Sequence, residues 1–325
     1  KNYVDNATPE AVRNTIKANK FEPFIPNYIS YKEYLSKGGY VISNKISNNE
    51  ISKEQIINIL NESGLKGKGG AGFPTGKKWG IVSKYKGLKY LTINGDEGEP
   101  GTFKDRYFLE TDPHRFLEGT LIASQFINAH RVYIYIRDEY PSVIEILKNE
   151  ISILEKEKII PDNYFIVRRG AGAYICGEES AMIESIEGKR GLPRHRPPYV
   201  AEVGLFGKPT LTNNLETIYW IRDIIEKGSN WFSNQGVRGR KGFHSFSISG
   251  RVKNPGVKIA PAGTTVQELI DNYCDGMAEG HTFKGYLPGG ASGGILPSSL
   301  NNIPLDYDSK ELDEEGCFLG SAAVV

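Results

Sequence analysis

The sequence is poor in the residues that build metal sites and disulfide frameworks. Its three cysteines, Cys176, Cys274 and Cys317, lie far apart and form no C-x-x-C pair, so their spacing supports neither a zinc site nor a disulfide framework. The five histidines are equally scattered, and no two of them are spaced to share one face of a helix. We therefore predict no metal site, and the composition argues against a metal hydrolase.

An excess of charge of one sign and long apolar runs are also missing. Forty Lys and Arg residues oppose 39 Asp and Glu residues, for a formal net charge of +1, so no overall field attracts nucleic acid or an anionic membrane. No apolar run approaches the roughly 18 residues of a membrane span. The first thirty residues lack the apolar core of a signal peptide. We expect a cytoplasmic protein with no nucleic-acid partner and no direct membrane insertion.

What the chain does contain is an alternation of strand and helix patterns. Its 325 residues leave room for about two or three domains. Because parallel strands need long crossover connections, the alternation predicts an α/β fold with a mainly parallel sheet. The expected strands are 88–94, 131–137 and 163–169, and the expected helices are 51–64, 77–85, 114–129, 141–157 and 178–187. Ser52 and Gln55 are spaced as a capping box for the first helix, and Gly64 is its expected terminator.

The pattern changes after about residue 236, where short strands and turns replace the long alternation. Residues 246–259 predict two strands joined by a Pro-Gly turn, and 264–273 predict a helix capped by Thr265. Residues 284–294 predict a strand that leads into a glycine loop. This order suggests a small β-grasp unit. The expected organisation is an N-terminal arm over 1–50, a ligand-binding α/β domain over 51–235 and a β-grasp domain over 236–325.

The first chemically informative motif is GLKGKGGAGFPTGKKWG, Gly64 to Gly80. Gly67 to Gly72 match G-x-G-x-x-G, but a helix precedes them, whereas a dinucleotide fold needs a strand there. A P-loop fails as well, because Lys78 stands where Ser or Thr should bind magnesium. Side-chain-free amides beside Lys68, Lys77 and Lys78 still indicate a site for some other phosphate or ring system. A flexible surface loop is the alternative, but two aromatic residues and a proline make the stretch too apolar and stiff to favour it.

Acidic side chains follow the strand expected at 88–94. Asn94, Asp96, Glu97 and Glu99 lie just beyond its carboxyl end, which is the edge at which open α/β sheets bind ligands. Their oxygens can accept hydrogen bonds from ribose or ribityl hydroxyls and from ring N–H groups. The alternative is an acidic turn that pairs with the basic residues of the following FKDR segment.

Two further stretches repeat this chemistry. RRGAGAYICGEESAMIES joins a strand, a glycine turn and a helix whose first turn carries Glu178 and Glu179, although acidic residues are common at helix starts. PRHRPPYVAEVGLFGKPTLTNN offers Arg and Tyr side chains that can sandwich a purine, and Asn213 with Asn214 to bind a phosphate or a ring carbonyl. No nucleophile stands beside a base. This suits hydride transfer between a nicotinamide and a flavin, because the cofactors then carry the reaction.

Three of these stretches resemble one family. GAGAYICGEESAMIES resembles the nucleotide-site signature of the 51-kDa flavoprotein subunit of respiratory complex I. GLKGKGGAGFPTGKKW and NGDEGEPGTFKDRY are similar to the flavin loops of that family, in the expected order. The resemblance covers about residue 30 to the end. Within the family, three segments look most similar to the β (diaphorase) subunit of soluble NAD-dependent formate dehydrogenases: EGKRGLPRHRPPYVAEVGLFGKPTL, LPGGASGGILP and GCFLGSAAVV.

The resemblance implies a site for FMN and NAD(H) on a Rossmann-like domain, followed by a ubiquitin-like β-grasp domain of the SLBB type. The residues assigned to FMN are Gly67, Gly69, Gly70, Lys78, Asn94, Asp96, Glu97, Gly177, Asn213 and Asn214, and Lys68 and Glu178 complete the cofactor-binding set. The residues assigned to NADH are Phe73, Glu99, Tyr174, Glu179, Arg196 and Tyr199. Glu99 and Glu179 are expected to act in catalysis by orienting the nicotinamide end and disfavouring a 2′-phosphate.

The function that the resemblance implies is a diaphorase subunit that transfers hydride between NAD(H) and FMN. Electrons would pass to iron–sulfur partners, including a thioredoxin-like 2Fe–2S subunit or domain of a formate dehydrogenase. Relatives continue into a helical bundle that ligates a 4Fe–4S cluster, and the scattered cysteines cannot supply its ligands, so we expect a fragment of a longer protein. The alternatives are a flavoprotein subunit of complex I or of a bidirectional hydrogenase and, from another class, a non-catalytic nucleotide-binding assembly module.

Overall fold

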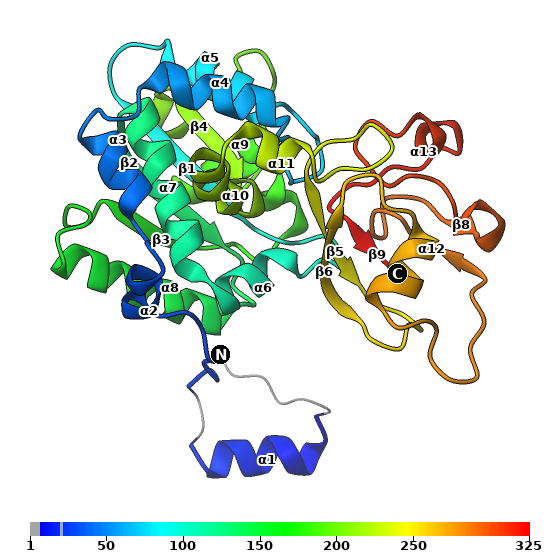
Figure 1. The fold of residues 1–325 in the computed structure, drawn as a ribbon. Coiled ribbons are helices and arrows are strands. Elements are labelled where there is room, and N and C mark those ends of the chain that lie inside the picture. Colours follow the sequence, from blue (N-terminus) through cyan, green and yellow to red (C-terminus); the bar gives the residue numbers. More distant parts are fainter. Residues whose placement is uncertain (1–6, 20–21) are drawn as a thin grey trace.

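The computed structural model describes residues 7–19 and 22–325, and its central feature is a four-stranded parallel sheet (Figure 1). The strands are β1 (Lys89–Gly95), β2 (Ala129–Ile136), β3 (Phe165–Arg169) and β4 (Thr210–Asn214). Their order is β3-β2-β1-β4. The predicted α/β fold with a parallel sheet is therefore confirmed. The chain runs outward from β1 to β2 and β3 and then returns to the other side of β1, so its winding reverses between β1 and β4.

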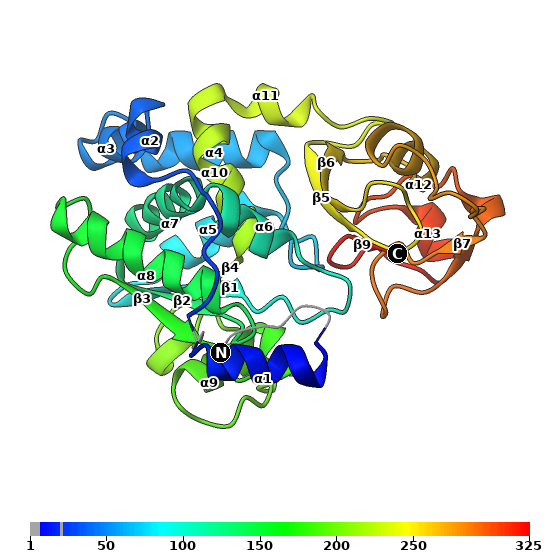
Figure 2. The same cartoon turned by 90° about the horizontal axis from the view of Figure 1, so that it is seen from below.

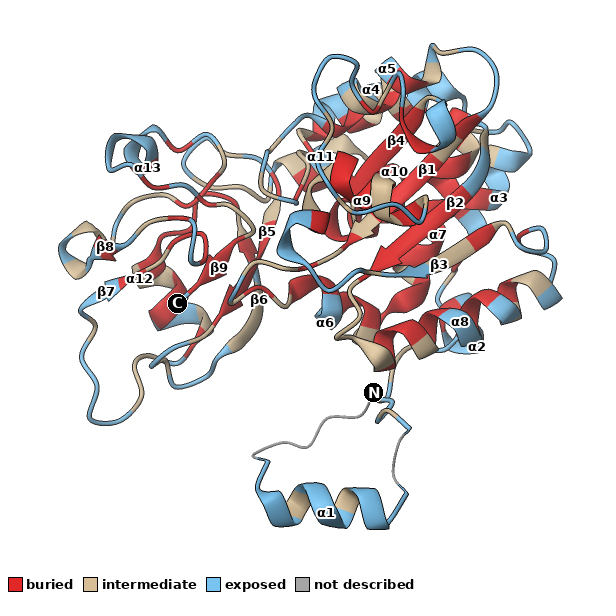
Figure 3. Ribbon diagram, turned by 180° about the vertical axis from the view of Figure 1, so that it is seen from behind, coloured by how far each residue is buried: buried red, intermediate tan, exposed pale blue. Residues whose placement is uncertain are grey.

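Helices cover both faces of the sheet. The expected helices are present as α4 (Lys53–Ser63), α5 (Thr75–Ser83), α7 (Pro113–Ile127), α8 (Pro141–Lys156) and α9 (Glu179–Ile186). Between these helices and the second domain, α6 (Lys104–Thr111), α10 (Leu215–Lys227) and α11 (Ser229–Ser233) are among the helices that were not expected. Along β2, Val132 and Ile134 join the larger core with α7, α8 and α10, whereas Tyr133 and Tyr135 join the smaller core with α9, because successive strand side chains point to opposite faces. Figure 3 shows buried residues along β1, β2 and β4 and on the helices that cover the sheet.

The start and end of α4 confirm the capping prediction. The Ser52 hydroxyl accepts the Gln55 amide N–H at 3.1 Å, and the Gln55 side chain accepts the Ser52 N–H at 2.8 Å. Gly64 ends the helix with φ of +72°, a left-handed conformation that costs glycine little. The glycine motif therefore begins directly at the end of a helix.

The N-terminal region contains three helices, α1 (Pro9–Lys17), α2 (Tyr31–Ser36) and α3 (Val41–Ser47). Helices α2 and α3 pack on α7, where the buried Glu118 carboxylate accepts the Tyr34 hydroxyl at 2.6 Å and the Tyr40 amide N–H at 2.8 Å. Helix α1 has no buried residue and lies apart from the sheet in Figure 1. Residues 1–6 and 20–21 of the expected N-terminal arm lie outside the described residues.

A second domain lies beside α6 and α11 (Figure 2) and has its own core. Its strands are β5 (Phe243–Ile248), β6 (Gly256–Pro261), β7 (Gly285–Tyr286), β8 (Leu296–Pro297) and β9 (Ala323–Val324). Its helices are α12 (Val266–Glu268), which continues into a π-helical turn over Leu269–Tyr273, and α13 (Lys310–Glu314). The predicted hairpin is confirmed as the antiparallel pair β5–β6, and β9 pairs with β5 in parallel. Among all the helices described, none is both long and apolar enough to cross a membrane.

Candidate functional site

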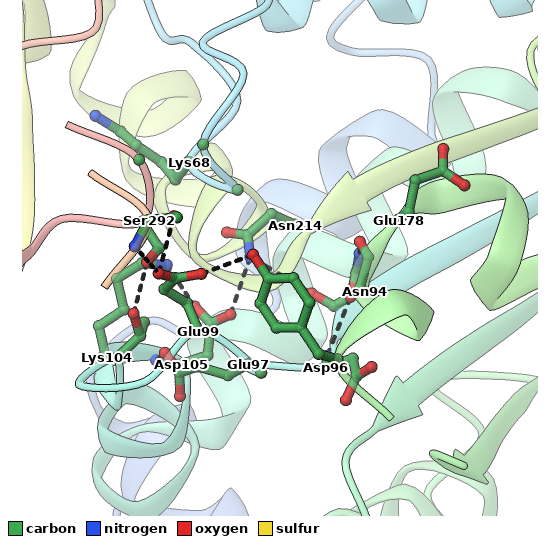
Figure 4. Close-up of a pocket in the computed structure, with 18 of the residues that line it drawn as sticks. Lys68, Asn94, Asp96, Glu97, Glu99, Lys104, Asp105, Glu178, Asn214 and Ser292 are labelled. Atoms are coloured by element: carbon green, nitrogen blue, oxygen red, sulfur yellow. Dashed lines mark hydrogen bonds and ion pairs between the residues drawn. The ribbon is translucent and has the colours of Figure 1, made fainter. Parts of the chain in front are cut away.

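A cavity of about 330 Å³ opens at the carboxyl ends of β1 and β4, between the sheet and the second domain (Figure 4). This is the point where the winding of the sheet reverses, which is where open α/β sheets form ligand crevices. The predicted residues that line it are Lys68, Gly69, Gly70, Asn94, Asp96, Glu97, Glu99, Tyr174, Gly177, Glu178 and Asn214. Those not among its lining residues are Gly67, Phe73, Lys78, Glu179, Arg196, Tyr199 and Asn213. The three loops that follow α4, β1 and β3 thus meet at one cavity.

The glycine loop presents bare backbone to this cavity. Gly70 has φ of +113°, which an L side chain rarely adopts. Across the described part of the chain, the amide N–H groups of Gly69 and Gly70 donate no hydrogen bond to the protein. A Cβ built at Gly69 would meet no atom nearer than 3.3 Å, and one at Gly177 none nearer than 3.4 Å. Packing within the chain therefore does not demand glycine at Gly177, whereas a Cβ at Gly69 would crowd Asn214, and the missing side chains at both positions leave room for a ligand.

Asp96 supplies an acceptor that the protein itself does not use. Within the described residues its Oδ2 atom is buried and has no hydrogen-bond partner. Burial raises the pKa of its carboxyl to about 6. A buried acceptor without a donor is costly, so the arrangement fits a ligand that brings a hydroxyl or ring N–H to this atom. The free amides and this carboxylate together match the ribityl hydroxyls and ring edge of FMN.

Asn94 and Glu97 line the cavity but are already held by the protein. Asn94 donates its side-chain amide to the Gly177 carbonyl at 2.8 Å and accepts the Asp96 N–H at 3.0 Å, which joins two of the loops. The buried Glu97 carboxylate accepts the amide N–H of Asp105 at 2.8 Å, at the start of α6. Burial, together with the charge of Asp105, raises the Glu97 pKa to about 7. These two side chains shape the wall.

Beneath the cavity lies a buried charge network that sequence reasoning did not assign to the site. Lys104 Nζ lies 2.9 Å from Asp105 Oδ1 and 3.0 Å from Glu216 Oε2. Asn214 caps α10 by accepting the Glu216 N–H at 3.0 Å and donates to Asp105 Oδ2 at 2.9 Å. Burial lowers the pKa of Lys104, but the two carboxylates outweigh it and raise the pKa overall. The adjacent Lys and Asp after the acidic loop were the available sequence signal, of which only the basic residues were interpreted, as partners of an acidic turn.

The predicted cofactor residues Lys68 and Asn213 direct their polar groups elsewhere. The Lys68 ammonium donates to the Phe243 carbonyl and lies 3.1 Å from His244 Nδ1, both in the second domain, and Figure 4 shows the side chain pointing away from Asp96. Burial lowers the Lys68 pKa to about 8. Asn213 Oδ1 accepts the Trp79 indole N–H at 2.9 Å. Lys68 therefore joins the glycine loop to the second domain.

A charged cluster stands next to the cavity at the start of α9. Lys78 Nζ lies 3.2 Å from Glu179 Oε2. Arg196 pairs with Glu178 and lies 3.5 Å from Glu179. Glu178 also caps α9 by accepting the Ser180 N–H at 2.9 Å. The exposed rings of the predicted NADH residues are those of Phe73, Tyr174 and Tyr199. Exposed aromatic faces beside paired charges suit a nucleotide that stacks and carries phosphates.

Glu99 reaches across the cavity to the second domain. Its Oε2 accepts the Tyr174 hydroxyl at 2.7 Å, and its Oε1 accepts the amide and the hydroxyl of Ser292, both at 2.9 Å. The other lining residues from the second domain are Phe318, Gly320 and Ser321. Sequence reasoning missed them because they reach the cavity only through the packing of two domains. The described residues contain no group of three or more His, Cys, Asp or Glu placed to hold a metal ion.

Known proteins are similar to this chain in sequence and in fold. Residues 60–223 match the Nuo51 FMN-binding domain family. The chain is 40% identical over 310 residues to an NADH-quinone oxidoreductase subunit of Rhizobium meliloti, and the match covers 93% of this chain and 73% of that protein. It is 44% identical over 290 residues to an NADH-quinone oxidoreductase subunit of Aquifex aeolicus, where the match covers 87% and 67%.

A solved structure shows the same similarity. A chain of an NAD+-reducing [NiFe]-hydrogenase superposes with a TM-score of 0.81 at 29% identity, over 97% of this chain. The present chain spans 55%, about half, of that hydrogenase chain.

Proposed function

The chain belongs to the Nuo51 FMN-binding family, that of the 51-kDa flavoprotein subunit of complex I, and from this membership we propose how its site works. As in the family, the chain is an FMN-dependent NADH oxidoreductase subunit with FMN and NAD(H) as cofactors. When bound, FMN would supply the hydride-accepting and one-electron chemistry that links the nicotinamide to iron–sulfur centres. The residues of this chain bind, orient and stabilise these groups.

The observation that carries the FMN assignment is that, in the described part of the chain, the unpartnered Asp96 Oδ2 and the free amides of Gly69 and Gly70 belong to residues that line the same cavity. We assign these groups to FMN, with Gly177 and Asn214 completing the wall. Gly67 does not line the cavity, and we assign it to the FMN site only as part of the same glycine loop. Lys78 supplies a cation next to the cavity, which stabilises negative charge on the reduced flavin. Asn94, Glu97 and Asn213 hold the loops in place, and Lys68 anchors the glycine loop.

Glu99 and Glu179 are the residues that we assign to the nicotinamide nucleotide. Both are carboxylates at the edge of the cavity, so they accept hydrogen bonds from hydroxyl or amide groups and repel an additional phosphate. Phe73, Tyr174 and Tyr199 offer ring faces, and Arg196 with Glu178 offers a charged rim. This arrangement favours NADH over NADPH.

The domain organisation and the partners are proposals of the same kind. We propose that residues 236–325 form a ubiquitin-like β-grasp domain of the SLBB type, because β9 returns beside β5 after the hairpin and α12. We propose the division 1–50, 51–235 and 236–325 for the chain. The partners would be iron–sulfur proteins, including a thioredoxin-like 2Fe–2S subunit or domain, in a cytoplasmic oxidoreductase.

The electron donor that we favour is formate, through the similarity of the two glycine-containing segments 287–297 and 316–325 to the formate dehydrogenase β subunit. The matched relatives carry the names of NADH-quinone oxidoreductases and of a hydrogenase, which keeps those complexes as alternatives. Purifying the native complex and identifying its partner chains by mass spectrometry decides among them, since a formate dehydrogenase catalytic subunit must copurify if formate is the donor.

Reconstitution tests the core of the proposal. The purified chain, stripped and then mixed with FMN, should turn yellow and quench flavin fluorescence, and NADH should bleach it anaerobically. A folded chain that takes up no FMN would contradict the assignment and favour a non-catalytic assembly module. A chain that binds FMN but is bleached equally by NADPH would contradict the roles given to Glu99 and Glu179.

A further inference from the structure

A loop of the second domain reaches into the proposed nicotinamide site. Residues 289–294 form the glycine-rich connection between β7 and β8, and Ser292 lies in its middle. Both the amide and the hydroxyl of Ser292 donate to Glu99 Oε1 at 2.9 Å. Figure 4 shows Ser292 next to the Glu99 carboxylate.

The loop is held firmly where it meets Glu99. Gly290 has φ of +85°, and its amide donates to the Ala323 carbonyl of β9 at 2.7 Å. A Cβ on Gly290 would lie only 2.9 Å from Glu99 Cγ, and one on Gly289 only 2.2 Å from the Phe318 carbonyl oxygen. Side chains at these two positions would push the loop away. The glycines thus allow the second domain to approach Glu99 closely.

These contacts fix the orientation of the carboxylate. A carboxylate offers about four acceptor positions, and Ser292 and Tyr174 fill three of them. The remaining position lies on Oε2, the oxygen that Tyr174 also bonds. Burial raises the Glu99 pKa, but the hydrogen bonds from Tyr174 and Ser292 outweigh it and lower the pKa overall. The carboxylate is therefore held ionised with one acceptor position available.

We propose that Ser292 is a positioning residue for the nicotinamide nucleotide, acting through Glu99. The second domain then contributes to nucleotide recognition in the α/β domain, because it sets the direction of the one open acceptor. This inference rests on the proposed function, which assigns Glu99 to the nicotinamide end. It goes further by naming a residue outside the flavin domain that controls the affinity for that nucleotide.

The test compares Ser292→Ala with Ser299→Ala, an exposed serine of the same domain, in the full FMN-loaded chain. Ser292→Ala should raise the KM for NADH about three- to tenfold, while kcat stays within about twofold, because one charge-assisted hydrogen bond is lost. NAD+ affinity is measured by calorimetry between about pH 4 and 8. On acidification it should begin to fall at a higher pH in Ser292→Ala than in the wild type, because the Glu99 carboxylate becomes easier to protonate. Ser299→Ala should match the wild type in all three measurements.

A double-mutant cycle with Glu99→Gln separates this role from simple packing. If Ser292 acts through Glu99, its effect on KM should shrink to within about twofold in the Glu99→Gln background. An equal effect in both backgrounds, or an unchanged KM and pH profile in Ser292→Ala, overturns the inference while the proposed function stands. A wild-type chain that binds FMN but not NAD+ overturns both, and a difference confined to the flavin absorbance spectrum overturns the inference alone.

Discussion

Asp96 has opposite effects on ligand binding and on the stability of the ligand-free protein. Among the described residues its buried Oδ2 has no donor, and a ligand hydroxyl or N–H would supply one. Asp96→Asn removes the charge, so the flavin-free protein should gain about 1 kcal/mol in its free energy of unfolding. FMN affinity should fall about tenfold, because a hydrogen bond to a charged acceptor is lost. Urea unfolding and fluorescence titration measure the two effects.

The pH dependence of the same variant supplies its control. The native Asp96 pKa is about 6, above its ordinary value of 3.8, so between about pH 4 and 6 the native state binds more protons than the unfolded state. Asp96 therefore destabilises the flavin-free wild type progressively as the pH rises through this window. The stability gain of Asp96→Asn should be present at about pH 7 and absent near pH 4. A gain that is equal at both values would show that burial of the charge is not its cause.

Lys78 and Lys77 form a matched pair for testing the cation beside the flavin. Lys78 pairs with Glu179 next to the cavity, whereas Lys77 is exposed and lies over the Phe73 ring. Lys78→Ala should lower the midpoint potential of bound FMN by about 30 mV, because about 1.4 kcal/mol of stabilisation of the reduced anion is lost. Spectroelectrochemistry measures this potential. Equal shifts of the midpoint potential in Lys78→Ala and Lys77→Ala would indicate a general effect of nearby positive charge rather than a specific role of Lys78.

For single residues, the sequence predicts which loops line the cavity better than it predicts which groups each side chain contacts. The residues after β1 and β3 line one cavity because the carboxyl ends of parallel strands share an edge. The Lys68 ammonium turns to His244, and Asn213 bonds the Trp79 indole. Neither contact leaves a trace in local sequence, because each depends on a residue more than 100 positions away. The local sequence around a Lys in a glycine loop does not indicate whether its ammonium group contacts a phosphate or a neighbouring domain.

Helix α10 shows how one element supports the site. Asn214 caps it and also bonds Asp105, so Asn214→Ala removes a cap and leaves a buried carboxylate short of a donor. The expected loss is about 2 to 3 kcal/mol of stability, with weaker FMN binding because Asn214 lines the cavity. Ser52→Ala, at the exposed cap of α4, should cost only about 1 kcal/mol and leave FMN affinity unchanged. Chemical denaturation and flavin titration check both. Weaker FMN binding in Ser52→Ala would instead assign the effect to general destabilisation.

Helices and strands with a clear pattern of apolar residues were predictable from the sequence. Short elements, and those in which charged and apolar residues are mixed, were not. Strands β1 to β3 are apolar runs between turns, and α4 has a complete capping box, so their existence follows from local sequence. Strand β4 is only five residues, TLTNN, and follows a long irregular stretch without any period. Helix α6, KDRYFLET, begins with charged residues directly after an acidic loop. Strand β4 exists because it pairs with β1, and α6 exists because it packs against α8, α10 and β5 of the second domain, which is tertiary information.

The two domains together form the cavity, and neither closes it alone. Ser292, Phe318 and Ser321 come from the second domain, and Thr102 of the α/β domain bonds the Ser321 hydroxyl at 2.5 Å. Lys68 extends from the glycine loop to His244 on β5. Ligand affinity should consequently be linked to how tightly the domains associate, because separating them removes part of the wall and one anchor of the glycine loop.

His244 offers a titratable probe of that association. Its Nδ1 accepts the Lys68 ammonium at 3.1 Å, and its Nε2–H donates to Asp306 at 2.9 Å, so the buried ring is neutral. Burial, with the Lys68 charge, lowers the His244 pKa to about 4 despite Asp306 and Glu216. Between about pH 4 and its ordinary pKa of 6.5, the unfolded state binds more protons than the native state. This residue therefore makes stability fall as the pH drops through that window.

Replacing the imidazole should remove this acid sensitivity. His244→Gln keeps an acceptor for Lys68 and a donor for Asp306 but does not titrate, so at about pH 7 it should be less stable than the wild type by about 1 to 2 kcal/mol through imperfect geometry. That deficit should shrink or reverse by about pH 4.5, where the unfolded wild type gains a proton that the buried ring of the native state does not bind. Urea unfolding at the two pH values measures it. A deficit independent of pH would mean that the His244 pKa is the same in the folded and unfolded states. A deficit that grows as the pH falls would mean that His244 is charged in the folded protein, and the Lys68 anchor would then need another acceptor.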